Sequence, residues 1–219
     1  MTDSPLALQM AARVEKLSPP LVEDVCAAAA LSVISLLDDD RSRAGGEWHD
    51  AVTSWNGARI RKIMRRARAS AWTRVQEVPG VSVSFGTAEV RAFVPGPMAE
   101  APSDVAKLQI QSSPLAEPDK VADLQSTEDN QTVMWLAITA DVEMTWGKRA
   151  AQCAHAGQLT WGKADADTLS RWEAGGRQIR VIHPTPALWK ALTETSSVHV
   201  HDGGFTEIPA GTLTAVGFW

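Results

Sequence analysis

An apolar run at residues 133–138, followed by a glycine and a stretch of small residues, constrains the fold more than any other part of the sequence. The run reads Val-Met-Trp-Leu-Ala-Ile, which is typical of a buried strand. Gly147 then marks a strand-to-helix turn, and the small residues after it, up to Gly157, suit a tightly packed helix. A fold built on this segment must bury a strand and cover it with a closely packed helix.

The predicted helix also carries polar chemistry along one edge. Lys148, Gln152 and His155 are spaced i, i+4 and i+7, so they fall on one helical face. One interpretation is a half-buried helix with a hydrogen-bonded glutamine and a solvated lysine, and the spacing alone favours it. The other is one edge of a functional site, which requires a second segment to complete it.

That second segment lies at the C-terminal end of the chain. Residues 202–217 read Asp-Gly-Gly-Phe-Thr-Glu-Ile-Pro-Ala-Gly-Thr-Leu-Thr-Ala-Val-Gly, and residues 147–156 read Gly-Lys-Arg-Ala-Ala-Gln-Cys-Ala-His-Ala. Together they resemble the type 2 (archaeal and eukaryotic-type) peptidyl-tRNA hydrolases, which carry G-K-x-A-A-Q-C-x-H-A and D-A-G-x-T-Q-I-x-P-G-T-x-T-V-L-G. The two motifs occur in the family's order, and the resemblance covers residues 131–219.

The resemblance implies an α/β fold for this region, with a small four-stranded mixed sheet flanked by helices. It implies hydrolysis of the ester that joins a peptide to the 3′-terminal ribose of tRNA, an aminoacyl-tRNA hydrolase activity in translation, with peptidyl-tRNA as the partner. No cofactor and no metal ion are implied. The residues at the family's functional positions are Lys148, Asp202 and Thr206 as catalytic groups, with Gln152, His155, Thr212 and Thr214 as substrate-binding groups.

A role for each catalytic group follows as a hypothesis. Asp202 would orient or activate water, Lys148 would stabilise negative charge or keep Asp202 ionised, and Thr206 would be an orienting hydroxyl. Without the resemblance, an ordinary ion pair between Lys148 and Asp202 that ties a loop to a helix start is the favoured interpretation.

The sequence departs from the family's pattern at three places. Trp146 stands where many members have a lysine, Glu207 stands where the usual residue is glutamine, and the chain ends in Gly-Phe-Trp. Two alternatives therefore stay open beside the hydrolase: a weak or inactive relative that binds RNA or protein, and a hydrolase of another acyl ester or acylated RNA.

Bulk properties set limits on the class of protein. At 219 residues with a net charge of -5, the chain can build a real core but is not basic overall, so any RNA contact must come from a local patch. Two cysteines do not make a disulfide framework, and no leader with a basic start and an apolar core is evident, which predicts a cytoplasmic location. Residues 25–37 form the longest uncharged run, shorter than the ~20 residues of a membrane span. No membrane contact is expected.

Two helices are predicted near the N-terminus. Apolar residues within 5–17 recur at helical spacing, which indicates a short amphipathic helix. Residues 21–37 are Ala-rich and nearly all apolar, so a helix there should be buried, and Pro20 fits its start. Three aspartates follow at 38–40; a solvated loop is the favoured interpretation and a metal site the less favoured one.

A third helix is predicted over residues 47–74. Its apolar stripe is accompanied by a dense set of positive charges, namely Arg59, Arg61, Lys62, Arg65, Arg66, Arg68 and Arg74. These charges repel one another unless acidic groups compensate them. Pairing with the protein's own carboxylates is one interpretation, and contact of Arg65 and Arg66 with a phosphate backbone is the other.

The rest of the chain gives an outline of its organisation. Alternation at residues 81–94 predicts a β-hairpin, and 96–130 reads as an extended connection rich in Pro, Ser, Asp and Glu. We therefore expect a mainly helical module with a hairpin at 1–95, the connection at 96–130 and the family-like domain at 131–219. That domain should run β-α-α-β-α-β-β, with its second helix capped by Asp165 or Asp167.

Two other candidate sites are weaker. Cys153 and His155 suggest a thiol and a base, but positions i and i+2 of a helix point in different directions. His199 and His201 share a strand face at a spacing that could hold zinc, but no third ligand is evident. The oligomeric state is not decided by the sequence, and a homodimer stays open.

Overall fold

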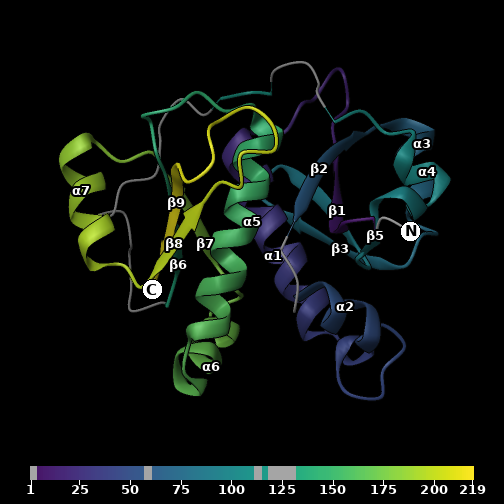
Figure 1. Ribbon diagram of the computed structural model, residues 1–219, viewed down its shortest axis with the longest axis horizontal. Coiled ribbons are helices and arrows are strands. Elements are labelled where there is room, and N and C mark those ends of the chain that lie inside the picture. The colour runs from purple at the N-terminus through teal and green to yellow at the C-terminus, as the bar shows by residue number, and fades with distance from the viewer. Residues whose placement is uncertain (1–3, 57–60, 111–114, 118–131) are drawn as a thin grey trace.

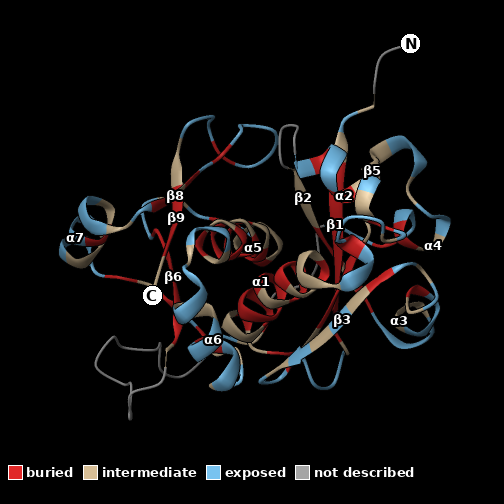
Figure 2. Cartoon of the chain, turned by 90° about the horizontal axis from the view of Figure 1, so that it is seen from below, coloured by how far each residue is buried: buried red, intermediate tan, exposed pale blue. Residues whose placement is uncertain are grey.

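Two β-sheets enclose a pair of long helices in this protein, as its computed structural model shows (Figure 1). The structure describes residues 4–56, 61–110, 115–117 and 132–219. The two central helices are α1 (Val22–Asp38) and α5 (Trp146–Lys163). They lie side by side in both views, and Figure 2 shows them between the strands of the two sheets. Because one helix comes from each half of the chain, a single hydrophobic cluster joins the two halves.

The C-terminal sheet confirms the predicted four-stranded mixed sheet flanked by helices. Its strands lie in the order β7-β6-β9-β8, with β6 and β7 parallel and the other neighbours antiparallel. The strands are β6 (Met134–Ile138), β7 (Ile179–Ile182), β8 (Val198–His201) and β9 (Leu213–Phe218). All five residues of β6 are buried, as expected for a central strand that is covered on both faces.

Side-chain caps begin each helix of this half. The Thr145 hydroxyl caps α5, Asp165 caps α6 (Ala166–Ala174) and Thr185 caps α7 (Pro186–Thr195), each by accepting a backbone N–H. Asp165 is therefore the cap of the two candidates that the sequence left open. α6 ends where predicted, at a pair of glycines, and Gly176 adopts the left-handed conformation with φ +80°.

The N-terminal half holds a second sheet that the sequence did not reveal. Its main strands lie in the order β2-β1-β4-β3, and a short fifth strand pairs with β1. The strands are β1 (Leu6–Arg13), β2 (Lys62–Ala67), β3 (Gly80–Phe85), β4 (Ala88–Phe93) and β5 (Gly96–Pro97). β3 and β4 form the predicted hairpin, and α1 is the predicted buried helix.

Two of the three helix predictions for the N-terminal end are wrong. Residues 6–13 of the predicted helix 5–17 form β1. The predicted helix 47–74 is broken into α2 (His49–Asn56), β2 and α3 (Ala69–Val75), and residues 57–60 lie outside the described part.

Long-range pairing explains both errors. β1 is buried on both faces from Ala7 to Ala12, so its sequence shows no alternation of apolar and polar residues. β2 lies parallel to β1, with Leu8 opposite Lys62 and Arg13 opposite Ala67. Its residues include good helix formers, but this pairing overrides their local preference.

Shorter helices cover the outer faces of both sheets. α3 and α4 (Ser103–Ala106) pack with Val75, Val105 and Leu108 over Ala11, Ala67 and Phe93 of the N-terminal sheet. α7 covers the C-terminal sheet through a separate cluster that includes Leu192. Within the described residues, no helix combines the length and apolar character that crossing a membrane requires.

Part of the predicted connection 96–130 is ordered against the N-terminal sheet. It contains β5, a 3₁₀ turn (Met98–Glu100), α4 and a bridge from Ala116 to Leu21. Residues 111–114 and 118–131 lie outside the described part. The domain boundaries at 95 and 131 stay a prediction. One hydrophobic core contains residues of both halves, so the two sheets pack into a common structure.

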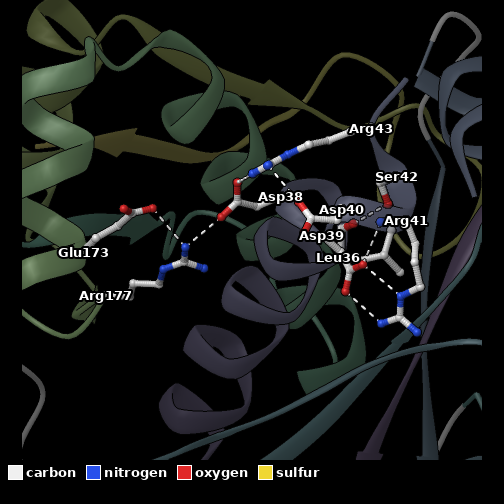
Figure 3. Close-up of polar contacts among 9 residues, drawn as sticks. All are labelled: Leu36, Asp38, Asp39, Asp40, Arg41, Ser42, Arg43, Glu173 and Arg177. Atoms are coloured by element: carbon white, nitrogen blue, oxygen red, sulfur yellow. Dashed lines mark hydrogen bonds and ion pairs between the residues drawn. The ribbon is translucent and has the colours of Figure 1, made fainter. Parts of the chain in front are cut away.

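The three aspartates after α1 form ion pairs with arginines (Figure 3). Asp38 pairs with Arg43 and Arg177, at 3.3 and 2.7 Å, and Asp40 pairs with Arg43 at 2.8 Å. Asp39 accepts hydrogen bonds from the Arg41 side chain and backbone, which lower its pKa to about 2. The Arg177 contact links the C-terminal half to the end of α1, so Asp38 serves the packing of the two halves, whereas Asp39 and Asp40 pair within their own segment.

The closest approach of α1 and α5 gives a test of this architecture. A Cβ added at Gly157 would lie 2.8 Å from the Ala30 Cβ, whereas one added at Gly162, on the same helix, would meet nothing within 4 Å. We expect Gly157→Ala to lower the free energy of unfolding by about 1–3 kcal/mol relative to Gly162→Ala, because the clash forces the helices apart. Chemical denaturation of both variants measures the difference. Equal stabilities would mean that the helices do not meet at Gly157.

Candidate active site

The start of α5 and the loop after β8 meet through a carboxylate. Glu207, in the loop, accepts hydrogen bonds from the Thr145 backbone N–H at 2.9 Å and from its hydroxyl at 2.7 Å. Thr145 in turn caps α5 through the Lys148 N–H. A negative charge at a helix N-terminus is favourable because the first N–H groups and the helix dipole point toward it. Glu207 therefore anchors the loop to the helix.

Asp202 is the centre of the polar cluster. Its side chain is only 5% exposed and forms an ion pair with Lys148, which is 13% exposed. The same Oδ2 accepts the Gln152 side-chain amide at 2.6 Å, and Oδ1 accepts the Gly204 N–H at 2.8 Å. Such a buried charge is tolerated only when it is paired and hydrogen-bonded, and here it is both.

Thr206 completes the cluster. The Lys148 ammonium donates to its Oγ1 at 3.0 Å, so one lysine connects the aspartate and the threonine. Gly204 makes this loop shape accessible, because its φ is +72° and an added Cβ would lie 2.6 Å from the Ala210 Cβ. The predicted catalytic residues Lys148, Asp202 and Thr206 thus lie together, joined by the predicted binding residue Gln152.

These groups line a pocket of about 590 Å³ that both halves of the chain enclose. From α5 and the loop, the lining includes Lys148, Gln152, His155, Asp202 and Thr206. The opposite wall comes from residues of the N-terminal half, namely Arg61, Lys62, Ile63, Met64, Met98 and Ile110. A mixture of apolar side chains with a few convergent polar groups is typical of a ligand-binding site.

His155 lies in this pocket on α5, as predicted, and is held neutral. Burial lowers its pKa to about 3, and the positive charge of Lys62 acts in the same direction. A neutral imidazole can donate one hydrogen bond and accept another, so His155 is a polar but uncharged part of the wall at neutral pH.

Thr212 and Thr214 do not line the pocket. The Thr212 hydroxyl donates to the Pro209 carbonyl at 2.8 Å, which stabilises the turn that follows Ile208. Thr214 is fully buried, and its hydroxyl donates to the Val200 carbonyl between β9 and β8 at 3.0 Å. Their positions support the loop and the sheet, and do not support the substrate contact that the resemblance implies.

Arg65 and Arg66 are also engaged within the protein. Arg65 is buried and donates to Gln9 at 2.6 Å and to the Leu108 carbonyl at 2.9 Å. The Arg66 guanidinium donates to the side chain of Gln109, whose carbonyl also accepts the Arg66 N–H. Because the predicted basic helix does not exist, these arginines do not form the expected phosphate-binding face.

The N-terminal wall is the part of the site that sequence reasoning missed. Arg61 and Lys62 belong to the basic run that was predicted to be helical, and Phe205 lies within the C-terminal motif. The Arg61 guanidinium lies 4.2 Å from the centroid of the Phe205 ring, so this contact bridges the two halves at the pocket. No local signal could identify this wall, because it depends on the packing of β2 beside α5.

Side chains of the weaker candidate sites contact other groups of the protein. Cys153 is buried beside Cys26 of α1, and the two thiols interact at the helix interface. His199 is hydrogen-bonded to the Thr193 carbonyl at 2.9 Å. Outside these candidate sites, His183, directly after β7, is 3.0 Å from the Glu23 carboxylate of α1.

Comparisons with known proteins agree with the geometry of the C-terminal half. Residues 132–219 match the family described as peptidyl-tRNA hydrolase PTH2. A peptidyl-tRNA hydrolase of Methanothermobacter thermautotrophicus is 30% identical over 89 residues, which are 37% of this chain and 80% of that protein. A probable peptidyl-tRNA hydrolase 2 of Schizosaccharomyces pombe is 31% identical over 99 residues, 41% of this chain and 48% of that protein.

The neutral state of His155 predicts how stability depends on pH. In the unfolded chain a histidine takes up a proton near its ordinary pKa of 6.5, whereas folded His155 does so only near pH 3. The unfolded state therefore binds more protons between these values, and the fold loses stability as the pH falls from 6.5 toward 3. In His155→Gln, the slope of the unfolding free energy against pH should be smaller in this window, by up to about 1.4 kcal/mol per pH unit.

Denaturation at several pH values measures this slope. The matched control is His201→Gln, since His201 also lies at the pocket but is exposed. The same slope in His155→Gln and in the unmodified protein would contradict the burial of a neutral imidazole at position 155.

Proposed function

This chain belongs to the peptidyl-tRNA hydrolase PTH2 family, and from that premise we propose that its pocket hydrolyses the ester bond of peptidyl-tRNA, releasing peptide and tRNA. The observation that carries the proposal is the convergence of Lys148, Asp202 and Thr206 in one pocket. These residues come from two segments that are more than fifty positions apart in the sequence. Stability of the fold alone does not require Lys148, Asp202 and Thr206 to face a pocket.

The ammonium of Lys148 is the electrophilic group in this proposal. Two of its three N–H donors point to Asp202 and Thr206, which leaves the third for a substrate oxygen. When water adds to the ester carbonyl carbon, negative charge develops on the carbonyl oxygen, and a fixed positive charge in a partly buried site stabilises it. The C–O bond to the ribose then breaks, and the ribose oxygen takes up a proton.

Asp202 and Thr206 position the water and the lysine. The Asp202 carboxylate accepts three hydrogen bonds from the protein, and its remaining lone pairs can accept one from the attacking water. Thr206 accepts from Lys148, so its own hydroxyl hydrogen is available to an ester oxygen. Gln152 and the Gly204 N–H keep the carboxylate in one orientation, so that the attacking water meets a fixed geometry.

The surroundings of the site fit the same proposal. Trp146, which replaces a lysine found in many members of the family, is buried and forms part of the core. Glu207, which replaces the usual glutamine of the family, accepts hydrogen bonds from Thr145 and so holds the loop on α5. We place the reaction in the cytoplasm, where peptidyl-tRNA arises during translation, and a homodimer remains a proposal without a described interface.

Hydrolysis of N-acetylphenylalanyl-tRNA tests the roles of the two charged residues. We expect Lys148→Met and Asp202→Asn each to lower kcat/KM by a factor of about 10²–10³, which is the usual effect of removing one transition-state contact. Release of the labelled acyl amino acid measures the rate. The control is Lys163→Met, because Lys163 lies at the far end of α5 and donates to the Ser197 carbonyl.

Each outcome has a definite meaning. If Lys148→Met and Asp202→Asn turned over the substrate as fast as the control Lys163→Met, the chemistry would lie elsewhere in the protein. No turnover by the folded, unmodified protein would favour a binding module that has kept the fold. Turnover of a simple acyl ester but not of the tRNA ester would favour a different acyl substrate.

A further inference from the structure

The wall of the pocket opposite α5 lies outside the region that matches known peptidyl-tRNA hydrolases. The match begins at residue 132, whereas Arg61 and Lys62 belong to the N-terminal half. β2 is one of the two edge strands of its sheet, and it packs against α5. Any contribution of this wall to substrate binding is therefore a property of this chain beyond the matched family domain.

Two cations of this wall have no acidic partner among the described residues. Neither Arg61 nor Lys62 is in an ion pair there, although both line the same pocket as the polar cluster. The two carboxylates that line the pocket are already used, because Asp202 is paired with Lys148, and Glu207 holds Thr145. The positive charge of this wall is consequently available to a ligand.

The contacts that these cations do make are to neutral groups. The Lys62 ammonium donates to the Gln158 side chain at 2.5 Å and lies 5.0 Å from the centroid of the Trp55 ring. The Arg61 guanidinium donates to the Met98 sulfur and covers Phe205. Burial lowers the pKa of Lys62, which is the response of an ammonium without a counter-ion. An anion beside it would favour the charged form.

Lys62 and the catalytic cluster lie at different ends of the same pocket. On α5, Lys62 influences His155 and donates to Gln158, which are seven and ten residues after Lys148, a rise of about 10–15 Å along the helix. Lys62 and Lys148 both line the pocket of about 590 Å³ but at different levels of α5, so a ribose and its substituents could lie in the pocket between them. In the proposed substrate, the nearest anion to the ester is the 5′-phosphate of the terminal nucleotide.

We propose that Arg61 and Lys62 bind the 5′-phosphate of the 3′-terminal nucleotide of the tRNA substrate, while Lys148 and Asp202 act on the ester. This inference rests on the proposed function. An ammonium and a guanidinium are both strong donors to phosphate oxygens. Arg65 and Arg66 do not serve in this way, because neither residue lines the pocket.

A pair of small substrates that differ in one group provides the test. The pair is the 2′(3′)-O-(N-acetylphenylalanyl) ester of adenosine and the same ester of adenosine 5′-phosphate. We expect the unmodified protein to have a kcat/KM about tenfold or more higher for the phosphorylated ester, as a charge-assisted contact gives. In Lys62→Met and Arg61→Met this ratio should fall toward one.

The control variant and the internal ratio make the test specific. Arg68→Met removes a charge from the same basic run at an exposed position that does not line the pocket, and it should keep the ratio of the unmodified protein. Since the ratio compares two substrates on one preparation, it does not depend on how much of a variant is folded. An unchanged ratio in both Lys62→Met and Arg61→Met would overturn the proposal.

A binding measurement separates this proposal from the proposed function. Calorimetric titration with adenosine 5′-phosphate and with adenosine reports on the phosphate subsite without any turnover. Tighter binding of the nucleotide that is lost in Lys62→Met supports the subsite even if the protein hydrolyses no tRNA ester, in which case only the proposed function fails. Hydrolysis of N-acetylphenylalanyl-tRNA combined with equal binding of the two ligands by the unmodified protein rejects the subsite and leaves the proposed function intact.

Discussion

The packing of α1 against α5 is the contact on which the rest of the structure depends. At Gly157 the two helices approach so closely that no Cβ fits opposite Ala30, and the alanines of α1 allow the same approach along its length. Each helix also packs on a sheet, so this one interface fixes the position of the N-terminal sheet relative to the C-terminal sheet. The pocket exists because that position brings the edge strand β2 beside the polar face of α5.

The second constraint is the buried ion pair of Lys148 and Asp202. Removing two charges from water is costly, and the cost is offset only where the remaining donors and acceptors are satisfied. Gln152 and the Gly204 N–H satisfy the carboxylate, and Thr206 takes a second N–H of the lysine. The carboxylate of Asp202 therefore holds the loop after β8 in one shape. Glu207 anchors the same loop to α5.

The sequence predicted the C-terminal half well because its signals are local. Glycines, capping residues and short apolar strands determine where its elements begin and end, and the two motifs bring Lys148, Asp202 and Thr206 into one site. The N-terminal sheet could not be predicted in this way. β1 is buried on both faces and shows no alternation, and β2 forms only because a partner fifty residues earlier in the chain pairs with it. The wall formed by Arg61 and Lys62 was missed for the same reason.

The charges of the pocket are arranged asymmetrically. At the Lys148 end the ammonium is paired with Asp202, and Glu207, which binds the neutral Thr145, adds a negative charge. At the Lys62 end, the partners of the ammonium among the described residues are an amide and an aromatic ring, and the nearby His155 imidazole is neutral. Coulomb interactions are stronger in a partly buried site than in water, so a ligand with one anionic end and one neutral end has a preferred direction in the pocket. An ester on a nucleotide has this asymmetry, and the preferred direction places its uncharged carbonyl group beside Lys148.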